Sequence, residues 1–331
     1  MATTARPDPR LDQYYAGPHT LAKVSHRRRL NLVVTGENAP TVILAGGHGC
    51  TTLSWAPVQI GLGLSARTVS FDQAGMGFSD PGPLPVTGSA VVEDLRAALK
   101  SAGVAPPYVL VGLSLGGLYM RLFAFKYPQD VLGMVMVDSS SEHQHRRFFG
   151  ENSPQLAALR RDQLRKLTRL GRLAREGALR AGVLEYDALI RSAATPMALT
   201  PTVEAARNNQ FASAARWRAM RSEMSVAGAI SFEQVAAARR PLGDMPLIVL
   251  SAGREVGEAL PDETAEQARA RVEIWRTLHE EIAALSTRGE RRVIDARHQI
   301  QIDKPDAVVG AIEQVLAMAR AERPALGRGD A

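Results

Sequence analysis

The 331-residue sequence contains a single cysteine, Cys50, and no long hydrophobic run. One cysteine excludes an internal disulfide bond and a cysteine-based metal cluster. The first 17 residues lack the apolar core of a signal peptide, and no later segment is apolar over the length needed to span a membrane. These absences predict a cytoplasmic protein that does not associate with membranes.

The sequence also lacks a recognisable nucleic-acid-binding motif, although its formal net charge is +6. Residues 141–245 hold 17 lysines and arginines against 10 acidic residues, a net charge of +7, which leaves 23 against 24 elsewhere. This segment shows no helix-turn-helix, zinc-finger or aromatic RNA-binding pattern. We therefore expect a solvated basic face and no nucleic-acid partner. The sequence gives no indication of the oligomeric state.

A strand, a sharp turn and a helix are predicted where residues 108–117 read YVLVGLSLGG. The first half favours a strand, and the apolar residues that follow as far as Tyr127 favour a helix. Ser114 stands at the turn, where a Cβ on Gly112 or Gly116 would collide with neighbouring structure. Such a turn holds a serine hydroxyl at its tip above the positive end of a helix, as a nucleophile requires.

Other apolar runs, bounded by glycine, proline and polar residues, predict strands at 21–24, 30–34, 41–45, 66–71, 131–137, 246–251 and 291–296. Helical spacing of apolar residues predicts helices at 89–99, 263–285 and 305–318. After an antiparallel edge pair, the alternation indicates an α/β fold with a mostly parallel sheet and helices on both faces. Ligands of such sheets bind at the carboxyl ends of the strands, where Gly47, Ser114 and Asp138 fall.

The pattern changes over residues 141–244, where alanine, leucine and arginine at helical spacing are interrupted by glycine and proline. We interpret this segment as a helical cap inserted between two parts of the core, residues 19–140 and 245–320. Residues 1–18 and 321–331 are expected to be a flexible arm and a flexible tail. Five large cap residues could line a pocket or simply hold the cap together: Phe148, Phe149, Phe211, Trp217 and Met220.

A nucleophilic serine needs a base within hydrogen-bond reach, and the base needs an anion that fixes its tautomer. Of the seven histidines, only His298 directly follows a late sheet strand, which makes it the predicted base. His279 is instead expected on an exposed helix, beside Glu280 and Glu281.

The glycine-rich loop at residues 46–50 lacks the lysine and the spacing of nucleotide-binding loops. A loop whose main-chain amides face a negatively charged oxygen fits better. The amides of His48 and Leu115 are therefore predicted to form an oxyanion hole. Asp72, which follows the next strand, is expected to bind loop amides and to be structural.

From residue 21 to residue 318 the chain resembles the α/β-hydrolase superfamily. The segment around Ser114 is similar to the nucleophile elbow of this family, and Gly46-Gly47-His48 stands where many members have His-Gly-x. Residues 72–79 are similar to the family's Asp-x-x-Gly-x-Gly-x-Ser loop. His298, followed by Asp303 and Pro305, matches the loop of the catalytic histidine, and the order of serine before histidine agrees.

Two carboxylates are candidates for the third catalytic residue. Most family members carry the acid after the strand equivalent to residues 246–251, where this chain has Glu255. Other members take it from the end of the strand that follows the elbow helix, which is Asp138 here. We prefer Asp138 because a short carboxylate at a strand end is better held against the histidine. Its structural alternative is a cap of the turn that contains Ser140.

The resemblance implies a serine hydrolase that cleaves a carboxylic ester or lactone of a small, fairly apolar molecule through an acyl-enzyme. Ser114, His298 and Asp138 would be catalytic, and no metal or organic cofactor is expected. A serine nucleophile argues against the chemistry of haloalkane dehalogenases and epoxide hydrolases, which use a carboxylate. Two alternatives remain: hydrolysis of a carbon–carbon bond in a diketone by the same residues, and a ligand-binding protein without turnover.

Overall fold

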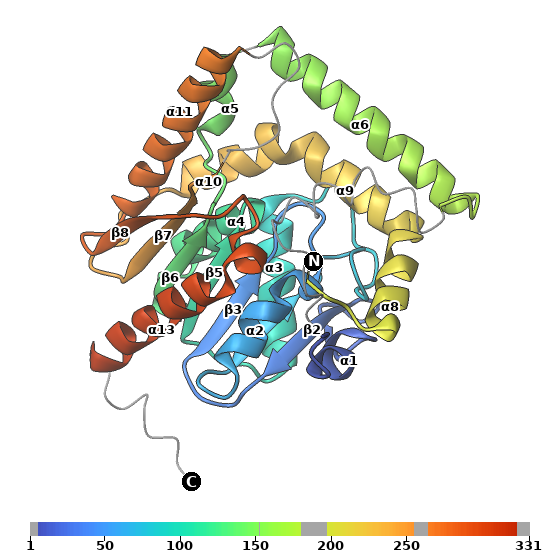
Figure 1. The fold of residues 1–331 in the computed structure, drawn as a ribbon, viewed down its shortest axis with the longest axis horizontal. Helices are drawn as coiled ribbons and strands as arrows, with labels where there is room; N and C mark the ends of the chain where they lie inside the picture. The colour runs from blue at the N-terminus through green and yellow to red at the C-terminus, as the bar shows by residue number, and fades with distance from the viewer. Residues whose placement is uncertain (1–5, 152, 180–196, 255–263, 323–331) are drawn as a thin grey trace.

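An eight-stranded sheet forms the centre of the computed structural model, which describes residues 6–151, 153–179, 197–254 and 264–322 (Figure 1). The strand order is β1-β2-β4-β3-β5-β6-β7-β8. β1 and β4 pair antiparallel with β2, and every other pair is parallel. The strands are β1 (Thr20–Lys23), β2 (Arg29–Thr35), β3 (Thr41–Ala45), β4 (Thr68–Phe71), β5 (Tyr108–Leu113), β6 (Val131–Val137), β7 (Leu247–Ala252) and β8 (Gly289–Ile294).

The predicted α/β fold with a mostly parallel sheet is confirmed. The central strands β3, β5 and β7 are buried along their whole length, as their uninterrupted apolar sequences predict. Predicted strands 21–24, 30–34 and 246–251 differ from β1, β2 and β7 by one residue at each end. Two predictions differ by two residues: 66–71, where β4 begins at Thr68, and 291–296, where β8 spans 289–294. In both cases the strand bounds follow the pairing with a neighbouring strand, which local sequence does not specify.

Helices cover both faces of the sheet. Apolar side chains of α3 (Gly88–Ser101), α4 (Leu115–Lys126) and α11 (Ala265–Ala283) pack on one face. Those of α2 (Ala56–Leu62) and α13 (Pro305–Glu322) pack on the other. Short helical segments complete this part: η1 (Thr52–Trp55), η2 (Pro128–Asp130) and α12 (Ile300–Asp303).

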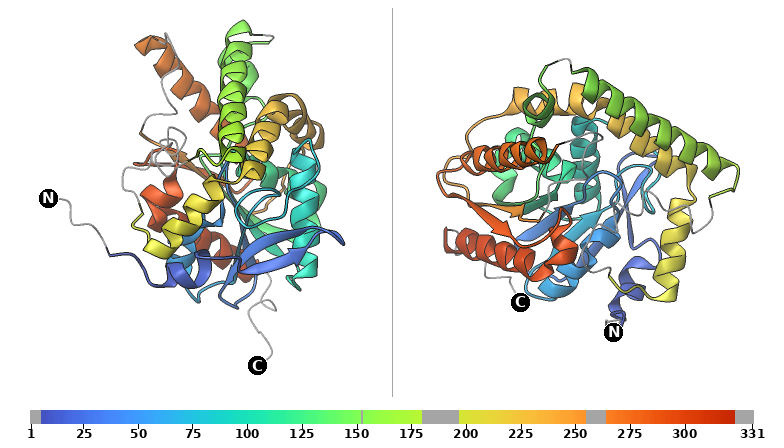
Figure 2. Two further views of the ribbon diagram at one scale, coloured as in Figure 1. Left: turned by 90° about the vertical axis from the view of Figure 1, so that its right-hand side faces the viewer. Right: turned by 45° about the horizontal axis from the view of Figure 1, so that its top comes forward.

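The segment between β6 and β7 is mostly helical where the structure describes it. α6 lies alongside α9 in both sets of views (Figures 1 and 2). Trp217 and Met220 belong to an apolar cluster with Met76 and Leu167. Phe211 packs against this cluster. These three large residues hold the helices together, which is one of the two roles considered for them. The helices are α5 (Gln144–Phe149), α6 (Pro154–Arg175), α8 (Pro201–Phe211), α9 (Ala214–Val226), η3 (Ala227–Ser231) and α10 (Phe232–Ala238).

The expectation of a flexible arm is wrong for residues 10–15, which form the helix α1 (Arg10–Tyr15). Leu11 and Tyr15 are 1% and 4% exposed and pack with Ala56 and Val203. Their spacing of four residues places them on one helix face. Burial of this apolar face stabilises the helix, although the two preceding prolines suggested a loose segment. α1 lies beside α8 (Figure 1).

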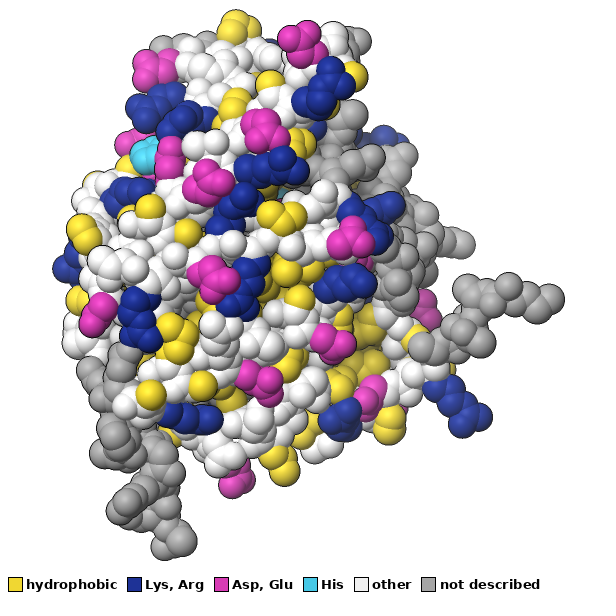
Figure 3. Space-filling model, turned by 60° about the vertical axis from the view of Figure 1, so that its left-hand side comes forward, with side chains coloured by type: hydrophobic (Ala, Val, Ile, Leu, Met, Phe, Trp, Pro, Cys, Tyr) yellow, Lys and Arg dark blue, Asp and Glu magenta, His cyan; other side chains and the backbone are white. Residues whose placement is uncertain are grey.

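Charges of both signs are intermixed on the face of the molecule shown in Figure 3. No described helix is both long enough and apolar enough to cross a membrane.

Candidate active site

Ser114 occupies the tip of the predicted turn, between the end of β5 and the start of α4. Its backbone has φ 52° and ψ −123°, a region that non-glycine residues rarely adopt. The turn is tight on both sides. A Cβ on Gly112 would lie 2.5 Å from the backbone of Gly117, and one on Gly116 would lie 2.3 Å from the carbonyl oxygen of Ala45. The two glycines thus permit the strained turn that presents the Ser114 side chain.

Asp138 directly follows β6 and also has a positive φ, of 39°. Its side chain is buried, and its Oδ2 accepts a 2.6 Å hydrogen bond from Nδ1 of His298. Its Oδ1 accepts hydrogen bonds from the amide of Ala252 (2.9 Å) and from Nε1 of Trp275 (3.0 Å). A carboxylate held by three donors can fix the ring of His298 with Nδ1 protonated, which leaves Nε2 as the basic atom.

The charge of Asp138 is maintained by these contacts. Burial alone would raise the pKa of its carboxyl group. The hydrogen bond from His298 and the charge of that ring lower it, with smaller contributions from His279 and the Ala252 amide, and the pKa lies below the ordinary value of 3.8. Asp138 is therefore ionised at neutral pH.

Main-chain hydrogen bonds tie Ser114 to the segment that carries Asp138. The amide of Ser114 donates to the carbonyl of Val137 (3.2 Å), and the amide of Ser140 donates to the carbonyl of Ser114 (3.0 Å). The two bonds flank Asp138 in the sequence, so the strained turns of Ser114 and Asp138 support each other. The structure thus brings Asp138 and His298 into direct contact and links Ser114 to Asp138 through the backbone.

The glycine-rich loop lies against Ser114. A Cβ on Gly47 would be 2.9 Å from Cβ and 3.5 Å from Oγ of Ser114. The amide of Cys50 donates to the carbonyl of Gly47 and closes a tight turn with His48 inside it. Leu115, the other predicted oxyanion donor, is the first residue of α4. The predicted oxyanion amides therefore belong to two elements that meet at Ser114.

The prediction for His279 is wrong, because its ring is 0% exposed. Its Nε2 donates to the carbonyl of Ser139 (3.0 Å), its Nδ1 accepts from Oγ of Ser251 (2.8 Å), and its Nδ1 is 4.0 Å from Oδ1 of Asp138. Burial lowers the pKa of His279. Two neighbouring glutamates suggested an exposed position. However, His279 lies four residues after Trp275 and hence on the buried face of α11.

Other residues around this site were not identified from the sequence. Trp275 binds Asp138, and the ring of Phe148 stacks on Trp275 with 5.8 Å between centroids. Glu223 of α9 contacts the ring of His48. No local motif marks either Trp275 or Glu223, because each reaches the site from a distant element. Glu255, the alternative acid, lies outside the described residues.

Asp72 has the structural role expected of it. Its carboxylate accepts hydrogen bonds from the amides of Thr52 (2.8 Å) and Phe78 (3.1 Å) and from the side chain of Asn31 (2.9 Å). Within the described residues, no group of three or more histidine, cysteine, aspartate or glutamate side chains is arranged to hold a metal ion.

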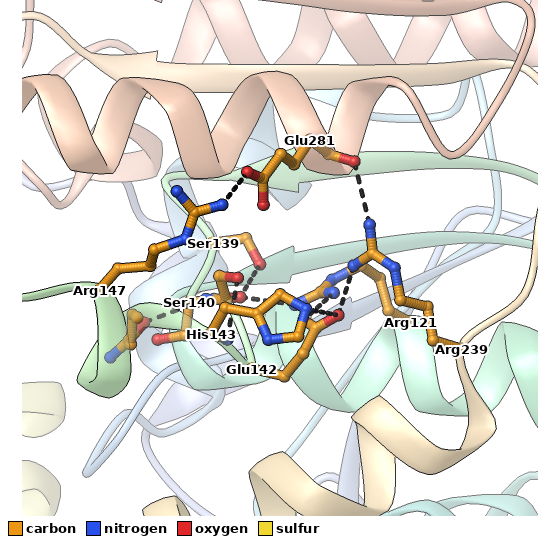
Figure 4. Close-up of polar contacts among 10 residues, drawn as sticks. Arg121, Ser139, Ser140, Glu142, His143, Arg147, Arg239 and Glu281 are labelled. Atoms are coloured by element: carbon orange, nitrogen blue, oxygen red, sulfur yellow. Dashed lines mark hydrogen bonds and ion pairs between the residues drawn. The ribbon is translucent and has the colours of Figure 1, made fainter. Parts of the chain in front are cut away.

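A buried ion-pair cluster lies where the chain leaves the sheet after Asp138 (Figure 4). The carboxylate of Glu142, whose side chain is 0% exposed, accepts from Arg121 of α4 (2.6 Å) and from Arg239 (2.5 Å). Arg121 also donates to the carbonyl of Ser140 (2.7 Å). Burial would raise the pKa of Glu142, but the two guanidinium groups, chiefly that of Arg121, lower it to about 2. The cluster thus braces the turn that contains Asp138.

Solved structures with the same fold span nearly the whole chain. The enol-lactonase from Burkholderia xenovorans is 19% identical with a TM-score of 0.57, and the match covers 89% of this chain and 99% of the other. A protein of Pseudomonas aeruginosa, provisionally named an epoxide hydrolase, is 21% identical with a TM-score of 0.70 over 95% and 99% of the two chains. At these identities the likeness concerns the fold alone.

Sequence comparisons identify the family. The uncharacterized protein YqjL of Bacillus subtilis is 31% identical over 103 residues, which is 31% of this chain and 41% of YqjL. The match thus spans less than half of that relative. A sequence model of the family described as alpha/beta hydrolase fold matches residues 40–305. Because this match covers most of the chain and the fold agrees with it, the protein belongs to the α/β-hydrolase fold family.

Proposed function

We propose that the protein is a serine hydrolase that cleaves a carboxylic ester or lactone of a small, fairly apolar molecule. The observation that carries this proposal is the strained turn of Ser114, joined by two backbone hydrogen bonds to the segment that holds the Asp138–His298 pair. Nucleophile, base and orienting carboxylate in such an arrangement are the components of acyl transfer to serine.

In the proposed reaction, Oγ of Ser114 attacks the carbonyl carbon while Nε2 of His298 takes the hydroxyl proton. The amides of Leu115 and His48 would stabilise the negative charge that develops on the carbonyl oxygen. His298 then gives the proton to the leaving alcohol, and the acyl group remains on Ser114. In the second half, His298 takes a proton from water, the hydroxide attacks the acyl-enzyme, and the carboxylic acid leaves as Ser114 regains its proton.

Release of p-nitrophenol from short-chain esters, together with a panel of lactones, tests the proposal. We expect the parent to turn over at least one of them and Ser114→Ala to lose at least about 10³-fold in kcat, because the attacking atom is gone. Ser101→Ala, at the exposed end of α3, is the matched control and should behave as the parent.

A fluorophosphonate probe provides an independent readout, because it reacts with an activated serine whatever the preferred acyl group. The parent should be labelled at Ser114 and the Ser114→Ala variant should not. Labelling at Ser114 with turnover of diketones and no esters would favour carbon–carbon bond hydrolysis instead. Absence of both labelling and turnover in the parent would leave the ligand-binding alternative.

A further inference from the structure

Glu223 belongs to α9 and contacts the two elements that carry the predicted oxyanion amides. Glu223 is 2% exposed, and its carboxylate accepts two hydrogen bonds, from Nδ1 of His48 (2.5 Å) and from the hydroxyl of Tyr119 (2.7 Å). These donors belong to different elements: His48 to the glycine-rich loop and Tyr119 to α4. One carboxylate from the inserted helices therefore joins the two elements that carry the predicted oxyanion amides.

Two more residues of α9 contact the same loop. Arg216 is 1% exposed, and its Nη2 donates to the carbonyl of Gly49 (2.6 Å). Met220 packs on Gly49, which has φ 73°, so closely that a Cβ there would be 2.7 Å from Cε of Met220. Residues 216, 220 and 223 follow one another at intervals of four and three, so they share one face of α9. This face contacts the loop beside Ser114 at successive points.

The protonation of Tyr119 supports this arrangement. Burial and the neighbouring Glu223 carboxylate hold the pKa of Tyr119 well above its ordinary value, so its hydroxyl keeps its proton and donates. Since α4 begins at Leu115, Tyr119 is one helical turn from the predicted oxyanion amide of that residue. The contact with Glu223 thus acts on α4 at the end nearest Ser114.

From these contacts we infer that Glu223 is a positioning residue for the reaction. It holds the His48 ring on one side and the Tyr119 hydroxyl on the other, and thereby sets the separation of the amides of His48 and Leu115. The inference rests on the proposed function. Oxyanion stabilisation depends on donors fixed in advance at the place where charge develops, so a loosened loop should slow acyl transfer more than it weakens substrate binding.

The first test compares Glu223→Gln with the parent on an ester that the parent hydrolyses. We expect kcat to fall by about 10- to 100-fold with KM changed by less than about twofold, because displacement of catalytic groups by an ångström has effects of this order. Glu233→Gln, an exposed glutamate on the neighbouring α10, is the matched control and should match the parent.

A double-mutant cycle with His48→Ala separates positioning from a general structural role. If Glu223 acts through the His48 ring, Glu223→Gln should have little further effect on kcat once that ring is removed. Equal effects in the two backgrounds would overturn the inference, as would an unchanged kcat or a rise in KM alone. Should Glu223→Gln fail to fold, Tyr119→Phe removes one donor and keeps the carboxylate, with an expected two- to tenfold loss in kcat, the usual size of one hydrogen bond.

The same measurements distinguish the inference from the proposed function. A parent that neither turns over esters nor reacts with a fluorophosphonate at Ser114 overturns both. If the parent hydrolyses esters and is labelled at Ser114, but Glu223→Gln behaves as the parent does, only the inference about Glu223 is overturned.

Discussion

Asp138 lies where the end of a sheet strand, a strained turn and a hydrogen bond to His298 meet. It directly follows β6 and has a positive φ. One of its carboxylate oxygens accepts a hydrogen bond from His298, and the other accepts from the Ala252 amide and from Trp275. The conformation turns the chain so that the side chain meets His298. Each of the three donors offsets part of the cost of burying the charge.

Replacing Asp138 with asparagine should therefore reduce kcat strongly. An amide can leave His298 in the wrong tautomer, and the equivalent change in serine proteases lowers kcat by about 10⁴-fold. We expect kcat for ester hydrolysis to fall by about 10³- to 10⁴-fold. The circular dichroism spectrum should match that of the parent, which would show that the fold is retained. Glu255→Gln is the matched control. If only the glutamate change abolishes turnover, the choice of Asp138 is wrong.

The positions of single residues could be predicted from the sequence where a local pattern surrounds them. The sharp turn that carries Ser114 could be predicted from its glycines and flanking elements, and the position of His298 from its place after a late strand. The contacts of Trp275, Tyr119 and Glu223 could not be predicted, because they form only when α11, α4 and α9 pack around the strand ends. His279 could have been placed correctly, since it continues the apolar face of α11.

At the junction between β6 and α5 the chain is held by a buried ion-pair cluster. Glu142 lies four residues after Asp138, and its carboxylate is buried between Arg121 of α4 and Arg239 beyond α10. Removing one member of a buried ion pair leaves the partner charge unsatisfied, which is costly. The elbow helix, the strand end and the last inserted helix are therefore joined by one carboxylate.

Glu142→Gln should destabilise the protein at pH 7 and less so in acid. The folded-state pKa of about 2 lies below the ordinary 4.5, so the stabilisation is complete above pH 4.5 and is lost as the pH falls toward 2. The difference corresponds to about 3 kcal/mol. Urea unfolding should show that the free energies of unfolding of the parent and the variant differ less at pH 3 than at pH 7. An equal difference at both pH values would contradict an ionised Glu142 in the folded protein. Glu204→Gln, 57% exposed, is the control.

The bounds of individual elements were predictable only where apolar runs are long. β3, β5 and β6 match the expected segments closely because they are apolar throughout and flanked by turn residues. β8, at the edge of the sheet, has a mixed sequence with Val293 53% exposed, and its range is set by pairing with β7. Helical periodicity indicated the inserted segment, but not which of its helices contacts the site.

Across the whole molecule, the inserted helices are attached to the rest of the chain at several separate places. α9 contacts the loop beside Ser114, Arg239 binds Glu142, and α8 packs against the N-terminal helix α1, where Thr200 hydrogen-bonds to Asp12. These contacts come from segments far apart in the sequence. A truncated chain that lacks α1 would lose the contact between α8 and α1.

Leu11→Ala should measure the contribution of α1. The side chain is 1% exposed, and truncation of a buried leucine costs about 2 to 5 kcal/mol. We expect a lower urea midpoint with little change in the slope of the transition. Leu64→Ala, at a residue 79% exposed, should leave the midpoint nearly unchanged. If Leu11→Ala lowers the free energy of unfolding by less than about 1 kcal/mol, α1 contributes little to the stability of the core.

The contacts of α9 also bear on protein engineering. A designer who exchanges residues 141–244 for the equivalent segment of another protein, in order to alter substrate preference, would remove Arg216, Met220 and Glu223 together with Glu142. The transplanted enzyme would keep Ser114, Asp138 and His298 and yet lose the side chains that hold the glycine-rich loop and the turn after β6. Successful chimeras of this fold should therefore be those in which the donor segment supplies, or is given, these four residues.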